Sequence, residues 1–75
     1  MLKIKSEVTG TVWKVLVNAG ESVQADEVLV IVESMKMEIP VESPVAGTVT
    51  AVHVAPDSQV KEGDLICTVD ASGEG

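Results

Sequence analysis

Apolar residues recur along the chain in short runs that are separated by turn-forming residues. The run at 28–32 is continuous Val-Leu-Val-Ile-Val, whereas 10–17 and 47–54 contain a Gly-Thr-Val-x-x-Val-x-Val pattern. β-Branched side chains pack well on a pleated surface, so these runs predict strands. The segments NAGES at 18–22 and APDSQ at 55–59 hold residues typical of turns. We therefore predict an all-β protein.

The same pattern occurs twice in the chain. Residues 2–33 align without gaps on residues 39–70 at an offset of 37, with nine identities in 32 pairs. The identities include Gly10 with Gly47, and most other pairs place an apolar residue opposite another. Two repeats are too few for a solenoid. We expect two half-sheets, related by a pseudo-twofold axis, that form a small sandwich or flattened barrel.

Residues 34–38, Ser-Met-Lys-Met-Glu, have no counterpart in the repeats, and Lys36 is their midpoint. They are expected to form a hairpin that joins the halves. A two-residue tip at Met35-Lys36 or Lys36-Met37 of the usual kind needs positive φ at both positions. Met and Lys resist that conformation. Departures from local rules are most often found at functional sites, so we place the candidate site here.

Composition and charge narrow the class of protein. The 75 residues, 45% of them apolar, are enough for one small domain, which we place at 1–70 with a flexible polar tail at 71–75. The net charge of −7 argues against nucleic acid. No apolar run approaches the roughly 20 residues of a membrane span, and no signal peptide is visible. The lone Cys67, which aligns with Val30, predicts a core position and favours a reducing cytoplasm.

Several further residues have structural interpretations. We expect Gly10 and Gly47 to meet backbone requirements, and Pro44 to fix the entry into the second half. Trp13 and His53 are more readily explained by packing or plain exposure than by a partner. One histidine without neighbouring ligands does not make a metal site. No phosphate-binding loop or nucleophile–base pair is visible.

The segment ESMKMEIPVESPVAGTV, residues 33–49, resembles the attachment segment of the biotinyl/lipoyl carrier domain family. The biotinyl branch usually has Ala-Met-Lys-Met and then Pro-Val-Ala/Ser-Gly, which match 34–37 and 44–47 here. The resemblance covers residues 2–70 and is closest to the short biotin/lipoyl attachment proteins. It implies a barrel-sandwich hybrid, a flattened barrel of two four-stranded antiparallel sheets. It also implies a non-catalytic carrier within a multi-component enzyme.

By this resemblance, biotin would be joined through an amide to the ε-amine of Lys36 by a biotin protein ligase. The loaded arm would accept a carboxyl group from a biotin carboxylase and release it at a carboxyltransferase. The residues that would flank the attachment are Ser34, Met35, Met37 and Glu38. The gapless repeat leaves no room for the inserted "thumb" of some bacterial carriers. We expect a thumbless, free-standing subunit that is monomeric when isolated.

Two positions depart from the family pattern. Ser34 replaces the usual Ala, a change that should leave the backbone unaltered but could affect handling by the ligase. Asp26 stands where many members have Gly, while Gly63 keeps that glycine in the second half. Aspartate tolerates the left-handed region better than most residues, so we expect the turn to survive.

The side chains around Lys36 have two interpretations each. Met35 and Met37 either form an apolar collar for the ligase or fold back onto the barrel edge. As strand neighbours of Lys36 they should share the face opposite to it. An acidic surround is either a solvated face or a partner surface; it comprises Glu33, Glu38 and Glu42.

Three functions remain open at this point. Methionine on both sides of Lys36 favours a biotin carboxyl carrier within the family. A lipoyl carrier, loaded by a lipoyl ligase to shuttle acyl groups or electrons, is the alternative, as is dual biotin/lipoyl attachment. The third is a small β-barrel interaction module without a prosthetic group. Its mark would be an aromatic-lined groove, and one aromatic residue in the chain disfavours it.

Overall fold

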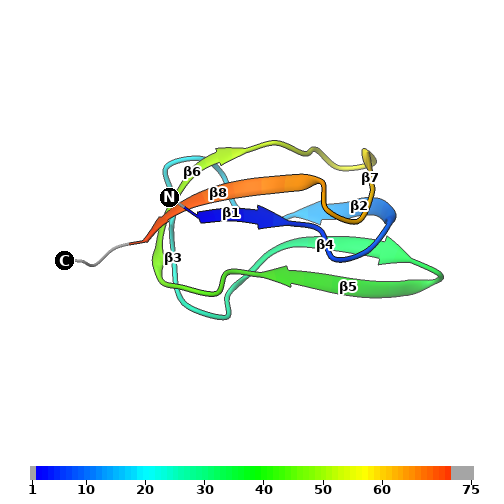
Figure 1. Cartoon of the computed structure of the whole chain (residues 1–75), viewed down its shortest axis with the longest axis horizontal. Helices are drawn as coiled ribbons and strands as arrows, with labels where there is room; N and C mark the ends of the chain where they lie inside the picture. Colours follow the sequence, from blue (N-terminus) through cyan, green and yellow to red (C-terminus); the bar gives the residue numbers. More distant parts are fainter. Residues whose placement is uncertain (1, 72–75) are drawn as a thin grey trace.

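The computed structural model describes residues Leu2–Ala71, and this part of the chain folds into eight strands (Figure 1). The strands are β1 (Leu2–Lys5), β2 (Gly10–Val15), β3 (Ser22–Val23), β4 (Val28–Ser34), β5 (Met37–Glu42), β6 (Gly47–Val52), β7 (Gln59–Val60) and β8 (Leu65–Ala71). The prediction of an all-β fold is confirmed.

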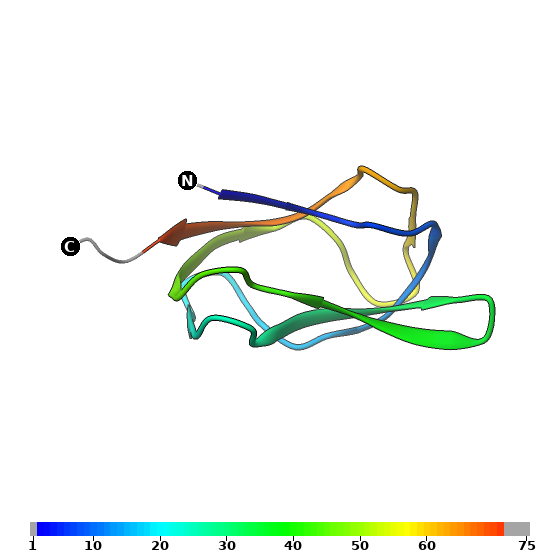
Figure 2. The same ribbon diagram turned by 60° about the horizontal axis from the view of Figure 1, so that its bottom comes forward.

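The strands form two antiparallel four-stranded sheets, with the orders β1-β8-β6-β3 and β5-β4-β2-β7. The two layers face each other, as Figure 2 shows, so the predicted flattened sandwich is confirmed. The expectation of two half-sheets is wrong, because each half of the chain places two strands in each sheet. Consecutive strands β1 and β2 lie in different sheets. An isolated pair of strands is at best marginally stable, and this interleaving gives each half the partners it needs.

The pseudo-twofold relation extends to single hydrogen bonds. The N–H of Ser6 donates to the carbonyl of Asp64 at 2.9 Å, and the N–H of Ser43 donates to the carbonyl of Glu27 at 2.9 Å. All four residues match at the offset of 37. The backbone of one half is therefore repeated in the other.

Two buried serines carry the same side-chain contact in both halves. Ser6 and Ser43 are almost fully buried. The hydroxyl of Ser6 donates to the carbonyl of Val8, and the hydroxyl of Ser43 donates to the carbonyl of Val45, each at 2.6 Å. A buried hydroxyl needs such a partner, and here each hydroxyl also fixes its turn.

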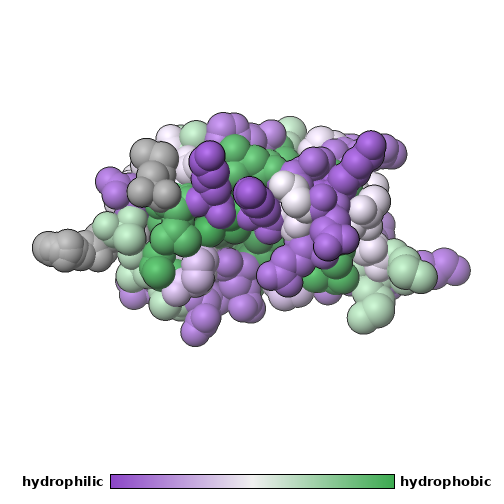
Figure 3. Space-filling model, in the orientation of Figure 1, coloured by the Kyte–Doolittle hydropathy of each residue, from purple (hydrophilic) through white to green (hydrophobic). Residues whose placement is uncertain are grey.

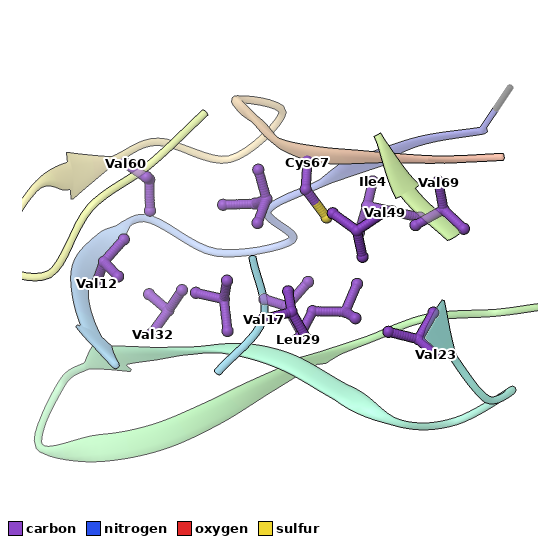
Figure 4. Close-up of a cluster of buried hydrophobic side chains, with 13 residues drawn as sticks. Ile4, Val12, Val17, Val23, Leu29, Val32, Val49, Val60, Cys67 and Val69 are labelled. Carbon is purple, nitrogen blue, oxygen red and sulfur yellow. The ribbon is translucent and has the colours of Figure 1, made fainter. Parts of the chain in front are cut away.

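The core lies between the sheets and is made almost wholly of valine, isoleucine and leucine (Figure 4). Its largest fully buried side chains are Leu29 and Ile66, which are pseudo-twofold mates. The full set is Ile4, Val12, Val17, Val23, Leu29, Val30, Val32, Val41, Val49, Val60, Ile66, Cys67 and Val69. The predicted core position of Cys67 is confirmed, and burial raises the pKa of its thiol.

Gly10 and Gly47 lie where the neighbouring strand leaves no space for a side chain. A Cβ built on Gly10 would lie 2.3 Å from the carbonyl oxygen of Glu33, and one on Gly47 would lie 2.3 Å from that of Asp70. No side chain fits at such a distance, so the neighbouring strands approach closely only because both residues are glycine.

The turns use glycine and aspartate interchangeably. Asp26 has φ of 69° and its mate Gly63 has φ of 91°, while Gly20 has 95° and its mate Asp57 has 72°. The expectation that Asp26 preserves its turn is confirmed. Aspartate takes the left-handed conformation at lower cost than most residues, so each half needs only one glycine for this purpose.

The two ends of the described chain lie together, opposite the hairpin that joins β4 to β5 (Figure 1). Leu2 pairs with Val69, and Ala71 pairs with Gly47. Ala71, which we expected in the tail, is thus the last residue of β8, and 72–75 lie outside the described residues. Between Leu2 and Ala71, the protein has no helix long and apolar enough to cross a bilayer.

Candidate functional site

The hairpin between β4 and β5 turns on two residues. Ser34 at the end of β4 pairs directly with Met37 at the start of β5. Met35 and Lys36 form the tip, with φ of 52° and 65°. Positive φ at both positions is the signature of the type I′ turn, which matches the twist of a hairpin. The structure thus has the conformation that the sequence predicted and that these side chains resist.

The tip projects from the end of the barrel (Figures 1 and 2). Met35 is 92% exposed, Met37 is 64% exposed and Lys36 is exposed. In Figure 3 this end, at the right, shows pale green beside purple surface. Met35 therefore does not fold back onto the barrel, and Met37 has only about a third of its surface covered. The amine of Lys36 is accessible to an enzyme.

The expected strand alternation around Lys36 does not apply. Met35 and Lys36 are turn residues, and of these neighbours only Met37 belongs to a strand. The rule that places alternate residues on opposite faces holds for extended backbone alone. Both methionines are instead exposed at the tip beside the lysine, as a collar requires.

The legs of the hairpin hold the tip in place. β4 and β5 are paired from Ser34–Met37 to Val28–Glu42. Val32 is fully buried, pairs with Ile39 on β5 and also pairs with Val12 on β2. The exposed turn thus continues a ladder that is anchored in the core.

Ser34 makes a contact that the sequence did not reveal. Its hydroxyl donates to the carbonyl of Thr9 at 2.8 Å, in the loop before β2. The Oγ1 of Thr9 in turn accepts a hydrogen bond from the N–H of Glu62 at 3.1 Å. Sequence reasoning treated Ser34 as a small residue in place of alanine. The serine at a position where the family usually has alanine was the one sign of this contact, because a hydroxyl there can form a hydrogen bond that alanine cannot.

The acidic surround lies along the hairpin legs. Glu33 and Glu38 are directly opposite each other in the ladder, one pair beyond Ser34–Met37. Glu42 follows further along β5, and all three glutamates are exposed. Like charges facing each other across two strands destabilise a sheet by roughly 0.2–1 kcal/mol. The pair is therefore a feature that folding does not require.

The remaining candidate residues lie away from the tip. Trp13 in β2 is 43% exposed, and the Nζ of Lys14 lies 4.7 Å from its ring centroid. His53 and Pro44 are exposed. Within Leu2–Ala71, no three His, Cys, Asp or Glu residues are placed to hold a metal ion. A groove of about 440 Å³ between β1 and β5 is not lined by the turn residues.

Comparison with known proteins gives one family match. A family model described as "Biotin-requiring enzyme", for the biotin/lipoyl domain, matches residues 3–69. This range includes the hairpin and all eight strands, in whole or in part.

Similar proteins include carriers of both kinds. The biotin carboxyl carrier protein of Streptococcus mutans is 45% identical over 60 residues, covering 80% of this chain and 46% of that protein. The chain thus spans about half the length of that relative. The biotinylated protein TB7.3 homolog of Mycobacterium leprae is 41% identical over 66 residues, covering 88% and 93%. The dihydrolipoyllysine-residue acetyltransferase of Azotobacter vinelandii is 40% identical over 62 residues, covering 83% and 10%.

A solved structure agrees in fold. The chain is similar to part of the Kluyveromyces lactis urea carboxylase, with a TM-score of 0.87 and 30% sequence identity. The match covers 92% of this chain and 6% of that protein. In that enzyme the matched region is therefore a small part of a much longer polypeptide.

Proposed function

Because the chain belongs to the biotin and lipoyl attachment domain family, we propose that it is a biotin carboxyl carrier in which Lys36 bears the covalently attached biotin. Domains of this family are non-catalytic carriers. The observation that supports Lys36 is its place at the exposed tip of the β4–β5 hairpin, in a strained turn between two exposed methionines. Backbone strain of this kind concentrates at functional sites.

The residues present fit an attached group. Attachment would form an amide between Nζ of Lys36 and the biotin carboxyl. The ligase would supply the activated acyl donor, release its activating group as the leaving group, and accept the proton of the amine. The exposed amine lets the ligase reach Nζ without unfolding the barrel. Amide formation removes one positive charge, so the formal net charge changes from −7 to −8. When bound, biotin supplies the ring nitrogen that accepts and releases the carboxyl group.

The chain's own contribution is to position the arm. The paired legs of β4 and β5 fix where the arm begins, while the exposed turn leaves it free to swing. A tether of this kind keeps its cargo near a partner's active site at an effective concentration of order millimolar. The cofactor supplies the chemistry and the protein supplies its placement.

Biotin is preferred over lipoate because of the residues beside the lysine. Met35 and Met37 are both exposed next to Lys36, and methionine on both sides is typical of the biotinyl branch. The alternative is a lipoyl carrier, or a domain that accepts either group. Its support is the 40% identity to the acetyltransferase of Azotobacter vinelandii, a protein named for its dihydrolipoyllysine residue.

The proposed partners follow from the carrier role. They are a biotin protein ligase for loading, then a biotin carboxylase and a carboxyltransferase. Similarity to the Streptococcus mutans carrier and to the urea carboxylase structure supports a carboxylase system. The lone buried Cys67 is in keeping with the proposed cytoplasmic location.

Intact-mass spectrometry tests the site and the cofactor together. Protein made in cells that hold both ligases should carry the mass of one biotinyl group. Lys36→Arg keeps the charge but should remove the adduct, while the matched control Lys61→Arg, at another exposed lysine, should retain it. A lipoyl mass would favour the alternative. An adduct that persists on Lys36→Arg would refute the assignment of the lysine.

A further inference from the structure

The pseudo-twofold relation allows the outer faces of the two sheets to be compared position by position. On the β5-β4-β2-β7 sheet, Ile31 lies between Val30 and Val32, which are fully buried, so its side chain is on the outer surface. Ile31 pairs with Pro40 on β5 and with Lys14 on β2. These three residues therefore form a row across the outside of this sheet.

Apolar side chains mark this surface. Trp13 is the unpaired bulge residue beside Lys14, and Leu16 follows the end of β2, with 43% and 49% of their surfaces exposed. Leu16 lies between the partly buried Val15 and the buried Val17, which places it on the outer side. The apolar outer residues are Trp13, Leu16, Ile31 and Pro40.

Their mates on the other sheet are polar or charged. At the offset of 37 these are Thr50, His53, Thr68 and Lys3, in the same order. The backbone is repeated in both halves, so the fold accepts polar residues at all four positions. Single exposed apolar residues are ordinary, but a contiguous group on one face marks an interaction surface.

The charges also differ between the two faces. Outward residues of β5 include Glu38 and Glu42, whereas β1 presents Lys3 and Lys5. In Figure 3 hydrophilic side chains project over β1 and β8. The outer face of the β5-β4-β2-β7 sheet thus has three glutamates and one lysine, Lys14, whereas the outer face of the other sheet has two lysines and one aspartate, Asp70. We call this surface the apolar–acidic face, since its net charge is negative; it comprises Trp13, Lys14, Leu16, Ile31, Pro40, Glu33, Glu38 and Glu42.

The face leads directly to the attachment hairpin. Glu33 and Glu38 are the first pair beyond the base of the turn, and the next pair that faces outward is Ile31–Pro40, because the pair between them includes the buried Val32. A partner that contacts this row therefore meets Lys36 at one edge of its footprint. Trp13, the large aromatic residue of the surface, has the character of a binding hot spot.

We propose that the apolar–acidic face docks the biotin carboxylase component, through basic side chains that meet the glutamates and an apolar hollow that receives Trp13. The proposal rests on the proposed function. The carboxyl donor of that reaction is an anion, so we expect basic side chains at the rim of the carboxylase active site. Complementary charge beside the tether steers the arm toward the rim and fixes its approach.

Carboxylation kinetics test this docking. The probe is a biotin carboxylase fraction selected for its ability to carboxylate the wild-type biotinylated carrier. Trp13→Thr and Glu42→Lys should each raise the KM for the carrier about tenfold, with kcat unchanged, because they remove binding that is uniform through the reaction. Trp13→Phe should restore most of the affinity. The KM of the wild type should rise with salt, and that of Glu42→Lys should rise less.

The controls distinguish a loss of docking from an effect of net charge and from a loss of folded protein. Glu62→Lys, in the turn before β8, changes the net charge as much as Glu42→Lys but lies outside the face, so its KM should stay at the wild-type value. Thermal melts check that each variant is folded. Equal KM values for wild type, Trp13→Thr and Glu42→Lys would overturn the docking role, as would equal effects of Glu42→Lys and Glu62→Lys.

Failure of the docking role and failure of the proposed function give different results. A biotinylated wild type whose face variants are carboxylated normally overturns docking alone. Slower loading by the ligase, with normal carboxylation, assigns the face to the ligase and also overturns the proposal. Absence of biotin on the wild type overturns the proposed function and the docking role with it.

Discussion

The two halves of the chain share a backbone and differ in what they present to solvent. Gly10 and Gly47 leave space for the same close approach, and Ser6 and Ser43 make the same hydrogen bond. Trp13, by contrast, has threonine as its mate. Positions that agree between halves are those that packing and turns determine. Positions that differ are free of those requirements, and we look for function among them.

The largest difference between the halves is the join itself. β4 and β5 are connected by the two-residue turn that contains Lys36. Their mates β8 and β1 are paired in the same way, but no turn connects them. The turn at Met35-Lys36 can therefore be changed without loss of any contact that the two halves share, and the following substitutions test this division.

The largest effect is expected from filling the space at the matched glycines. Gly10→Ala and Gly47→Ala should each destabilise the fold by about 3 kcal/mol, because the added Cβ meets a backbone carbonyl that has nowhere to move. Urea denaturation measures both. The carbonyl beside Gly10 belongs to Glu33, so only Gly10→Ala should shift the NMR signals of the hairpin tip. Unequal losses of stability would show that the halves are not energetically equivalent.

A smaller, again matched effect is expected at the buried serines. Ser6→Ala and Ser43→Ala each leave a carbonyl without its hydroxyl donor, at a cost of about 2 kcal/mol. Ser34→Ala is the control, because its hydrogen bond is exposed and should contribute less than about 1 kcal/mol. Thermal unfolding monitored by circular dichroism ranks the three. If Ser34→Ala lowered the stability as much as the other two substitutions, Ser34 would belong with the residues that hold the fold together.

Relief of strain at the tip should stabilise the protein and abolish its function. Met35→Asn with Lys36→Gly creates the preferred type I′ sequence. It should raise the free energy of unfolding by about 1–2 kcal/mol, because the native Met35 and Lys36 both resist positive φ. Intact mass should show no adduct. Asp26→Gly is the matched control in a structural turn, and it should gain less because aspartate already tolerates its φ. If the double variant were no more stable than the wild type, the turn at Met35 and Lys36 would not be strained.

The smallest effect concerns the facing glutamates. Glu38→Gln removes a repulsion across the hairpin and should stabilise it by about 0.3 kcal/mol at low salt, with the gain disappearing at high salt. Glu62→Gln, outside the ladder, should be neutral. Paired thermal melts at the two salt concentrations resolve the difference. If Glu38→Gln still stabilised the protein at high salt, the cause would be the strand propensity of glutamine and not the removal of a charge.

Most of the fold was predictable because its signals are local and repeated. The Val-rich runs gave the strands, the offset of 37 gave the symmetry, and Met35-Lys36 gave a turn with positive φ. The exchange of strands between sheets was not predictable. A repeat identifies which segments are equivalent, but it does not say which segments pair.

At the site, the location was easier to predict than the contacts. The midpoint of the repeats indicated Lys36 as the candidate. The bond from Ser34 to Thr9 joins residues 25 positions apart, and no local pattern encodes such a distance. The exposure of Met35 and Met37 depends on how far the tip extends past the barrel, which is a property of the whole sheet.

The position of the chain ends relative to the hairpin has a mechanical consequence. β1 begins and β8 ends at one end of a body 39 Å long, and the β4–β5 hairpin, which holds Lys36, projects from the other (Figure 1). A linker attached at either chain end would hold the barrel by the end opposite the hairpin. The distance that the cargo could reach from its anchor would then be the sum of the lengths of the linker, the barrel and the lysyl arm. A short linker would therefore suffice to span distant active sites, because the barrel supplies much of the distance.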